Sequence, residues 1–488
     1  MNAAAPPERS PATLFVDYHS LAASWTASQR AIAPRPDVGF ADLAADFLAR
    51  HSGAEAHDLL KDLVEGKIFS VEVWRGRILA VLQAIDHAFY RIHPRAILTA
   101  AAPPLPDWLR DARFMRRKSG AYLQTADWQL IARGPLLRAS RNPHASNADL
   151  FSDYFAALTV APRTLTHDGR AIRVEMKAIP LDPFTGVPAS SVPGSETVGF
   201  VPLAITSGDL IAEPRPHADR IFARYGPAPH FDAGAAALAA LTELGGIDIA
   251  VMPELAMNEA HHDWLADALA GNSKPVPKLI VAGSCNSNAL SGEDQPWNET
   301  RVLNARGTEL WRQRKLWPAG VDHKTAAKYG IDKPDAKGLT LEDNAAGDTL
   351  VVADLDGLGR CVILICQDCE MPVFAPAVVT VFQPDWIFTP IFDCSIDAGR
   401  WAHARAFGLS NLSQARCLAV TNMAFAGGKT GMGLAVGPKE TADGHVDDVD
   451  RAMAIVEIEA GAIGAAKLQW RAGVWHQSWL SGVPARLV

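Results

Sequence analysis

The chain has 488 residues, of which 48% are hydrophobic and 20% are charged, and its formal net charge is −8. This composition is typical of a folded globular protein and excludes a largely disordered chain. A single hydrophobic core rarely extends beyond about 250–300 residues, so the length favours two domains. The negative charge gives no general attraction to nucleic acid or to anionic membranes, and we expect neither as a partner.

The sequence contains no run of about 18 uncharged apolar residues, and its N-terminus lacks a basic start followed by an apolar stretch. These features predict neither a membrane-spanning helix nor a secretory signal. All the cysteines lie in the C-terminal half, several of them inside apolar runs, which indicates the reduced thiols of a cytoplasmic protein. Cys366 and Cys369 form a CxxC motif, but without a second such pair we predict no metal site.

The N-terminal part of the chain divides by composition. Residues 1–36 are rich in Ala, Pro and Ser, and we expect a mobile start there. The next segment, 39–133, has apolar residues at spacings of three and four, which indicates helices. One strand is expected over 172–179, before a linker rich in Pro, Gly and Ser. We therefore expect residues 37–195 to form a mainly helical region and linker, for which the sequence indicates no function.

From residue 196 the pattern changes to alternating strands and helices. An apolar strand is expected over 198–205, and the Ala- and Leu-rich helix over 233–244 ends at a Gly-Gly pair, which is a usual C-terminal cap. A second strand is expected over 247–252, and further strands and helices follow. This alternation predicts an α/β domain over residues 196–488.

Three reactive side chains follow apolar strands in this domain. Glu254 comes after one strand, Lys315 after another, and Cys366 ends a third. A thiol, a base and a cation are what acyl transfer to cysteine requires, because the thiol reacts as thiolate and the cation can stabilise an oxyanion. Each residue taken singly has an ordinary alternative: a solvated loop charge for the glutamate and the lysine, and a small buried hydrophobe for the cysteine.

The joint order is more specific than any one of these residues. Pro253-Glu254, then Lys315-Leu316-Trp317-Pro318, then the strand ending in Cys366-Gln367-Asp368 with Pro372 after it, resembles the nitrilase (carbon–nitrogen hydrolase) superfamily over residues 196–488. The resemblance implies a four-layer α-β-β-α sandwich, catalytic roles for Glu254, Lys315 and Cys366, no metal or organic cofactor, and association into at least a homodimer.

The family often has a second glutamate between the lysine and the cysteine. Glu342 is the only Glu between residues 319 and 348, which makes it the first choice, and Asp322, Asp332 and Asp335 are the alternatives. The backbone N–H of Gln367 is expected to assist Lys315 in binding the oxyanion. Asp368 is expected to fix the turn after the nucleophile.

The resemblance implies hydrolysis of a non-peptide carbon–nitrogen bond through a thioester. Cys366-Gln367-Asp368 is similar to the amidase and carbamoylase branches, which favours an amide or carbamoyl substrate over a nitrile. Two alternatives stay open: an N-acyltransferase that uses the same residues, and a non-catalytic sensor or binding protein on the same fold.

Several other residues have both an ordinary and a functional interpretation. Three tryptophans are candidates to line the pocket, although core packing is the simpler role; two cysteines near the site are expected to pack inertly; and two histidines are expected on a solvated helix surface. They are Trp297, Trp317, Trp401, Cys369, Cys394, His261 and His262.

Overall fold

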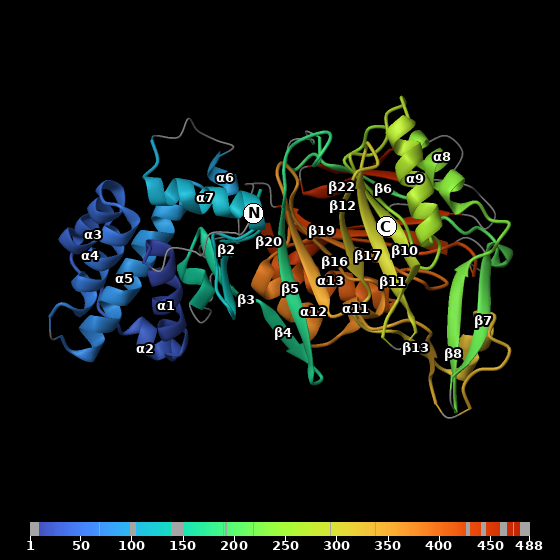
Figure 1. The fold of residues 1–488 in the computed structure, drawn as a ribbon, viewed down its shortest axis with the longest axis horizontal. Helices are drawn as coiled ribbons and strands as arrows, with labels where there is room; N and C mark the ends of the chain where they lie inside the picture. The colour runs from blue at the N-terminus through green and yellow to red at the C-terminus, as the bar shows by residue number, and fades with distance from the viewer. Residues whose placement is uncertain are drawn as a thin grey trace. The chain divides into compact units, whose positions relative to one another are not determined.

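The computed structural model divides into two compact units, residues 1–164 with 176–178, and residues 165–175 with 179–488 (Figure 1). The structure describes residues 9–67, 69–97, 104–137, 151–188, 190, 193–217, 219–292, 294–336, 338–425, 430–440, 446–458, 466–471 and 473–478.

The first unit is mainly helical. Its helices are α1 Pro11–Ala23, α2 Ala27–Ala31, α3 Val38–Arg50, α4 Gly53–Glu65, α5 Val71–Tyr90, α6 Pro94–Ile97 and α7 Asp107–Ser119. Ser10 caps α1 by accepting a hydrogen bond from the backbone N–H of Thr13, and Phe15 of that helix is fully buried with Phe89 of α5 in the same core. Residues 11–31 are therefore helices that contribute to a core, in contrast to the mobile start expected over 1–36; residues 1–8 lie outside the described residues.

A small antiparallel sheet completes this unit. Its strands are β1 Leu123–Gln124, β2 Trp128–Ala132 and β3 Leu158–Pro162. The buried Asp86 of α5 accepts hydrogen bonds from the backbone N–H groups of Ala156, Ala157 and Leu158, at 2.8–2.9 Å. This carboxylate joins the longest helix of the unit to the sheet.

The boundary between the units lies earlier in the chain than the sequence suggested. β4 Thr164–His167 and β5 Arg170–Ile179 are the last two strands of an eight-stranded sheet in the order β20-β19-β18-β17-β16-β15-β5-β4. The division therefore falls near Thr164, whereas we expected residues up to 195 to belong with the helices. Alternate burial along β5 identifies a strand, but its sheet is set by its pairing with β15, which comes far later in the sequence.

The second unit contains two large sheets. The seven-stranded sheet has the order β12-β11-β10-β9-β6-β21-β22 and lies against the eight-stranded one. Its strands are β6 Thr197–Phe200, β9 Ile249–Val251, β10 Leu279–Leu290, β11 Pro296–Asn304, β12 Glu309–Arg314, β21 Ala466–Arg471 and β22 Val474–Ser478. The remaining strands of the other sheet are β15 Thr349–Leu355, β16 Gly359–Ile363, β17 Trp386–Pro390, β18 Arg416–Val420, β19 Thr430–Glu440 and β20 Val446–Ile458.

Helices cover the outer face of each sheet (Figure 1). α8 Ala233–Leu244 and α9 Glu259–Gly271 pack on the seven-stranded sheet, and α12 Phe374–Phe382 and α13 Trp401–Ser413 on the eight-stranded one. The inner strands β16, β17 and β18 are buried at every position, because both of their faces are covered. The expected four-layer α-β-β-α sandwich, preceded by a mainly helical region, is confirmed.

A buried arginine joins the two sheets. The guanidinium of Arg416 on β18 lies over the rings of Trp386 and Trp470, at 4.9 and 4.4 Å from their centroids, and pairs with the Glu196 carboxylate at 2.9 Å. Trp470 lies on β21 of the opposite sheet, and Glu196 directly precedes β6 of that sheet. Among the described residues, no helix is long and apolar enough to cross a membrane.

A third, smaller sheet has the order β13-β14-β8-β7. Its strands are β7 Leu210–His217, β8 Arg220–Pro227, β13 Gly320–Val321 and β14 Thr340–Glu342. β7 and β8 form a long hairpin, which Figure 1 shows at the lower right, and β8 pairs in parallel with β14 so that Ala223 lies opposite Glu342. This accessory sheet therefore carries one of the predicted site residues.

Candidate active site

Glu254 lies two residues beyond Met252, just past the end of β9. Its side chain is fully buried, and its backbone is fixed by a bridge to Ser284 and by a 2.7 Å hydrogen bond from the Asn422 side chain to its carbonyl oxygen. The carboxylate Oε1 accepts hydrogen bonds from Lys315 Nζ at 2.7 Å and from Asn298 Nδ2 at 2.8 Å. The other oxygen, Oε2, has no hydrogen-bond partner among the described residues.

Lys315 follows directly after β12. Its backbone N–H donates to the carbonyl of Asn298 on the neighbouring strand β11, which extends the sheet pairing to this residue. The ammonium is fully buried and donates to two carboxylates, Glu254 Oε1 at 2.7 Å and Glu342 Oε2 at 2.6 Å. Of the four acidic residues that the sequence offered as a second carboxylate, Glu342 reaches Lys315. The other three lie elsewhere: Asp322 caps the helix α10 His323–Lys328, Asp332 is exposed, and Asp335 pairs with Arg220.

Cys366 lies in the turn between β16 and the short helix α11 Gln367–Glu370. Its backbone has φ 46° and ψ −103°, a conformation that is strained for a residue with a Cβ atom. The backbone N–H donates to the carbonyl of Pro390 at 2.9 Å on β17, and this bond helps to hold the turn. Gln367 begins α11, and the first N–H of a helix has no partner within that helix.

Burial and charge set the protonation states of this cluster. Burial raises the pKa of Glu254 to about 6, despite the opposing effect of the Lys315 ammonium. Burial alone would lower the pKa of Lys315, but the carboxylates of Glu254 and Glu342 hold it well above its ordinary value. Burial and then the Glu254 charge raise the pKa of the Cys366 thiol well above its usual range, and Lys315 opposes them. At neutral pH the site therefore holds a thiol beside an ionised base and a charged ammonium.

Asp368 ties the lysine segment to the cysteine turn. Its carboxylate accepts hydrogen bonds from the backbone N–H groups of Leu316 and Trp317, both at 2.9 Å, and of Ile365 at 3.2 Å. Burial raises its pKa to about 7, and the Lys315 charge opposes that rise. The side chain thus fixes the turn after Cys366, as expected, and it also holds the segment that follows Lys315.

Sequence reasoning did not find Asn298 as a site residue. Its side chain is fully buried on β11, donates to Glu254 and leaves its Oδ1 atom without a partner among the described residues. The available signal was its place in the strand directly before the one that leads to Lys315. A polar amide inside an otherwise buried strand needs a partner, and that partner is the Glu254 carboxylate.

The remaining candidates lie outside the catalytic cluster. Trp317 packs on Phe374, and Trp401 donates to Asp393, so core and loop contacts account for both. Cys369 is buried. His262 is 2% exposed and its Nε2 bonds the carbonyl of Ala282, so the expected solvated position is wrong for it, because α9 turns this side chain toward β10.

A small cavity of about 40 Å³ lies over the cysteine. The accessory sheet supplies much of its wall, and the other wall residues come from the turns around Cys366 and Phe392. The lining residues are Ala223, Tyr225, Ala319, Val321, Tyr329, Thr340, Glu342, Cys366 and Phe392. The ring of Phe392 lies 4.8 Å from that of Tyr225 and 5.3 Å from that of Tyr329, so the cavity has an aromatic side.

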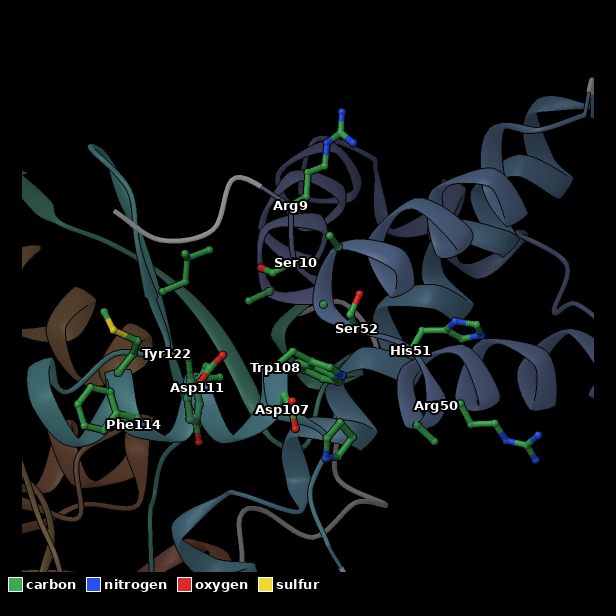
Figure 2. A pocket seen from close by; sticks show the side chains of 18 residues that line it. Arg9, Ser10, Arg50, His51, Ser52, Asp107, Trp108, Asp111, Phe114 and Tyr122 are labelled. Carbon is green, nitrogen blue, oxygen red and sulfur yellow. The ribbon is translucent and has the colours of Figure 1, made fainter. Parts of the chain in front are cut away.

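A much larger cavity, of about 830 Å³, lies within the helical unit (Figure 2). Trp108 and Tyr122 line it, together with small side chains such as Ser10 and Ser52, and its lining includes neither a cysteine nor a lysine. It therefore lacks the thiol and the ammonium that the second unit brings together. Among the described residues, no cluster of His, Cys, Asp and Glu is arranged to hold a metal ion.

Comparison with known proteins shows that this chain is similar to solved structures in its fold alone. No family model and no curated protein matches the chain. Among similar solved structures, Nit3 from Saccharomyces cerevisiae has 13% sequence identity and a TM-score of 0.34, with 58% of this chain and 93% of that chain covered. The CN-hydrolase superfamily protein XC1258 from Xanthomonas campestris has 14% identity and a TM-score of 0.34, covering 57% and 91%.

The amidase from Nesterenkonia sp. AN1, as a cysteine-to-alanine mutant in complex with butyramide, has 13% identity and a TM-score of 0.38, covering 59% and 94%. At these identities and scores, the case for a function rests on the geometry of Glu254, Lys315, Glu342 and Cys366. The solved structures to which this chain is similar include members of the nitrilase, or CN-hydrolase, superfamily.

Proposed function

We propose that this protein is a cysteine-dependent carbon–nitrogen hydrolase that acts on a small amide or carbamoyl compound. One observation carries the proposal. Lys315 donates to both Glu254 and Glu342, and Cys366 lines the same cavity as Glu342. A nucleophile, a base and a cation in one buried site are the requirements of acyl transfer.

In the first half-reaction, the thiol loses its proton to the Glu254 carboxylate as Sγ of Cys366 forms a bond to the carbonyl carbon. The free Oε2 atom of Glu254 is available to receive this proton. The carbonyl electrons move to oxygen, where the Lys315 ammonium and the Gln367 N–H stabilise the negative charge. When the intermediate collapses, the carbon–nitrogen bond breaks, the nitrogen takes the proton from Glu254, and ammonia or an amine leaves.

In the second half-reaction, Glu254 removes a proton from water as the water oxygen attacks the thioester carbonyl. Lys315 again stabilises the oxyanion. Collapse breaks the carbon–sulfur bond, and the sulfur regains its proton from Glu254. Glu342 keeps Lys315 charged and oriented throughout, because it supplies the second carboxylate on the same ammonium.

We favour an amide or carbamoyl substrate over a nitrile, on the sequence Cys366-Gln367-Asp368. An N-acyltransferase would form the same thioester and pass it to an amine in place of water. Product analysis separates the two, since hydrolysis yields a free acid and transfer yields a new amide.

The test measures ammonia release from a panel of short amides and carbamoyl compounds, together with mass spectrometry of the protein for a thioester on Cys366. We expect turnover with the native chain and none with Cys366→Ala or Cys366→Ser, while circular dichroism shows the same fold. Cys394→Ala is the matched control, because Cys394 is half-buried and does not line the cavity over Cys366. Equal activity in Cys366→Ala and the native chain would refute the proposal.

We also propose, from the family resemblance, that the protein forms at least a homodimer and works in the cytoplasm. Light scattering over a range of concentrations tests the first point. A monomer at every concentration would contradict it.

A further inference from the structure

Tyr225 has a buried hydroxyl without a hydrogen-bond partner. The residue lies on β8, is 4% exposed, and its hydroxyl oxygen contacts neither a donor nor an acceptor among the described residues. Its carbonyl oxygen, by contrast, accepts from Asn286 Nδ2 at 3.1 Å. Buried polar groups are nearly always paired, so an unpaired one in a cavity indicates a place where a ligand supplies the partner.

The location of Tyr225 connects this hydroxyl to the proposed nucleophile. Tyr225, Glu342 and Cys366 line the same small cavity. Burial, and then the charge of Glu342, raises the pKa of Tyr225, so its hydroxyl stays protonated at neutral pH. It is therefore available as a hydrogen-bond donor.

The second tyrosine of the cavity gives a useful contrast. The hydroxyl of Tyr329 already donates to Asp393 Oδ1 at 2.8 Å. Both rings pack on Phe392, so the two tyrosines provide similar apolar surface. Tyr225 thus differs from Tyr329 in having a hydroxyl that is free to bind a ligand.

The size of the cavity limits that ligand. One water molecule needs about 10–15 Å³ of such volume, so a cavity of about 40 Å³ restricts the ligand to a short substrate. In the proposed reaction, the amide oxygen is bound at Lys315 and the nitrogen lies near the carboxylates. The acyl substituent is then the part of the substrate left to face Tyr225.

We propose that the Tyr225 hydroxyl donates a hydrogen bond to an oxygen on the acyl substituent, so that the site selects short amides with a polar acyl group over alkyl amides. This inference rests on the proposed hydrolase function and adds a substrate class to it. A purely alkyl substituent would leave the buried hydroxyl unpaired in the complex, and sites built to hydrogen-bond a substrate discriminate against analogues that lack the group.

The test compares glycolamide with propanamide, which differ by a hydroxyl in place of a methyl group. We expect the native chain to prefer glycolamide in kcat/KM by about 10- to 100-fold. Tyr225→Phe should remove most of that preference, chiefly by raising KM for glycolamide. Tyr329→Phe is the matched control, and it should leave the ratio of the two substrates within about threefold of its native value, because that hydroxyl is already engaged.

An unchanged ratio in Tyr225→Phe, with both substrates turned over, would overturn the proposal. If no amide is hydrolysed, the hydrolase function fails, and the role of Tyr225 is decided by binding. Titration of glycolamide into Cys366→Ala, with and without Tyr225→Phe, is then followed by NMR. Weaker binding in the double variant supports the Tyr225 contact; equal binding, or none in either protein, overturns it.

Discussion

Each unit of the molecule contains a buried aspartate that accepts three backbone hydrogen bonds. Asp86 in the helical unit binds the N–H groups of residues 156–158, and Asp368 in the second unit binds those of Leu316, Trp317 and Ile365. The contacts are similar, but only Asp368 holds segments that carry reactive side chains. The same type of contact therefore serves folding in one unit and placement of a site in the other.

Glu254 differs from both aspartates. Its Oε2 atom has no partner among the described residues, although the side chain is fully buried. Both oxygens of each aspartate accept backbone N–H groups, whereas Glu254 has one oxygen without such a partner next to a thiol. All three carboxylates are buried, and the unpaired oxygen distinguishes Glu254 from Asp86 and Asp368.

The largest expected effect on catalysis comes from replacing Glu254. Glu254→Gln should reduce kcat/KM by about 10²- to 10⁴-fold, because an amide cannot act as the general base. Its melting temperature should change little, since a buried charge is removed at the same time.

Asp86→Asn is the counterpart in the helical unit. We expect it to lower the free energy of unfolding by about 1–3 kcal/mol, because one of the oxygens that accept backbone N–H groups is replaced by a donor. Its kcat per folded molecule should stay at the native value. Steady-state kinetics combined with urea unfolding measure both quantities, and a catalytic loss in Asp86→Asn that exceeds the loss of folded protein would contradict the comparison.

Glu342→Gln tests the role of the second carboxylate on Lys315. Loss of this charge partner on Lys315 should cost about 10²- to 10³-fold in kcat/KM. Asp332→Asn is the control, because Asp332 is exposed and should have no effect. A native kcat/KM in Glu342→Gln would remove Glu342 from the proposed mechanism.

Asp368→Asn should lower both the stability of the protein and its kcat. We expect a loss of stability similar to that of Asp86→Asn and, in addition, a fall in kcat of about 10²-fold, because small displacements of reacting groups are costly. Urea unfolding gives the first value and kcat at saturating substrate gives the second. If the variant loses stability but keeps its kcat, then Asp368 has the same purely structural role as Asp86.

The smallest effect is a pH dependence. Glu254 must be ionised to accept the thiol proton, and burial raises its pKa to about 6. Below that pH the ionised fraction falls about tenfold per pH unit, so kcat/KM should fall with the same slope. A pH–rate profile between pH 4.5 and 8 that stays flat would show that Glu254 is not the base in the free enzyme.

The places of Glu254, Lys315 and Cys366 after three apolar strands could be predicted from the sequence, because strand ends are local features. Their convergence was expected only from the family resemblance, since two strands separate β9 from β12 and β16 belongs to the other sheet. Glu342 could be proposed because it is the only glutamate in its segment. The α/β class of the second unit and the helical pattern of the first were also accessible, since both depend on periodicity within short windows.

Only the tertiary structure decided which strands pair, and the rest follows from that pairing. β5 comes before the predicted boundary, yet it belongs to the eight-stranded sheet, and β21 from the end of the chain lies beside β6. The contact of Asn298 with Glu254, the reach of Asp368 to Leu316 and the place of Tyr225 over Cys366 all join distant segments. Sequence periodicity shows which face of a strand is buried, but hydrogen-bond pairing between distant strands determines what that face meets.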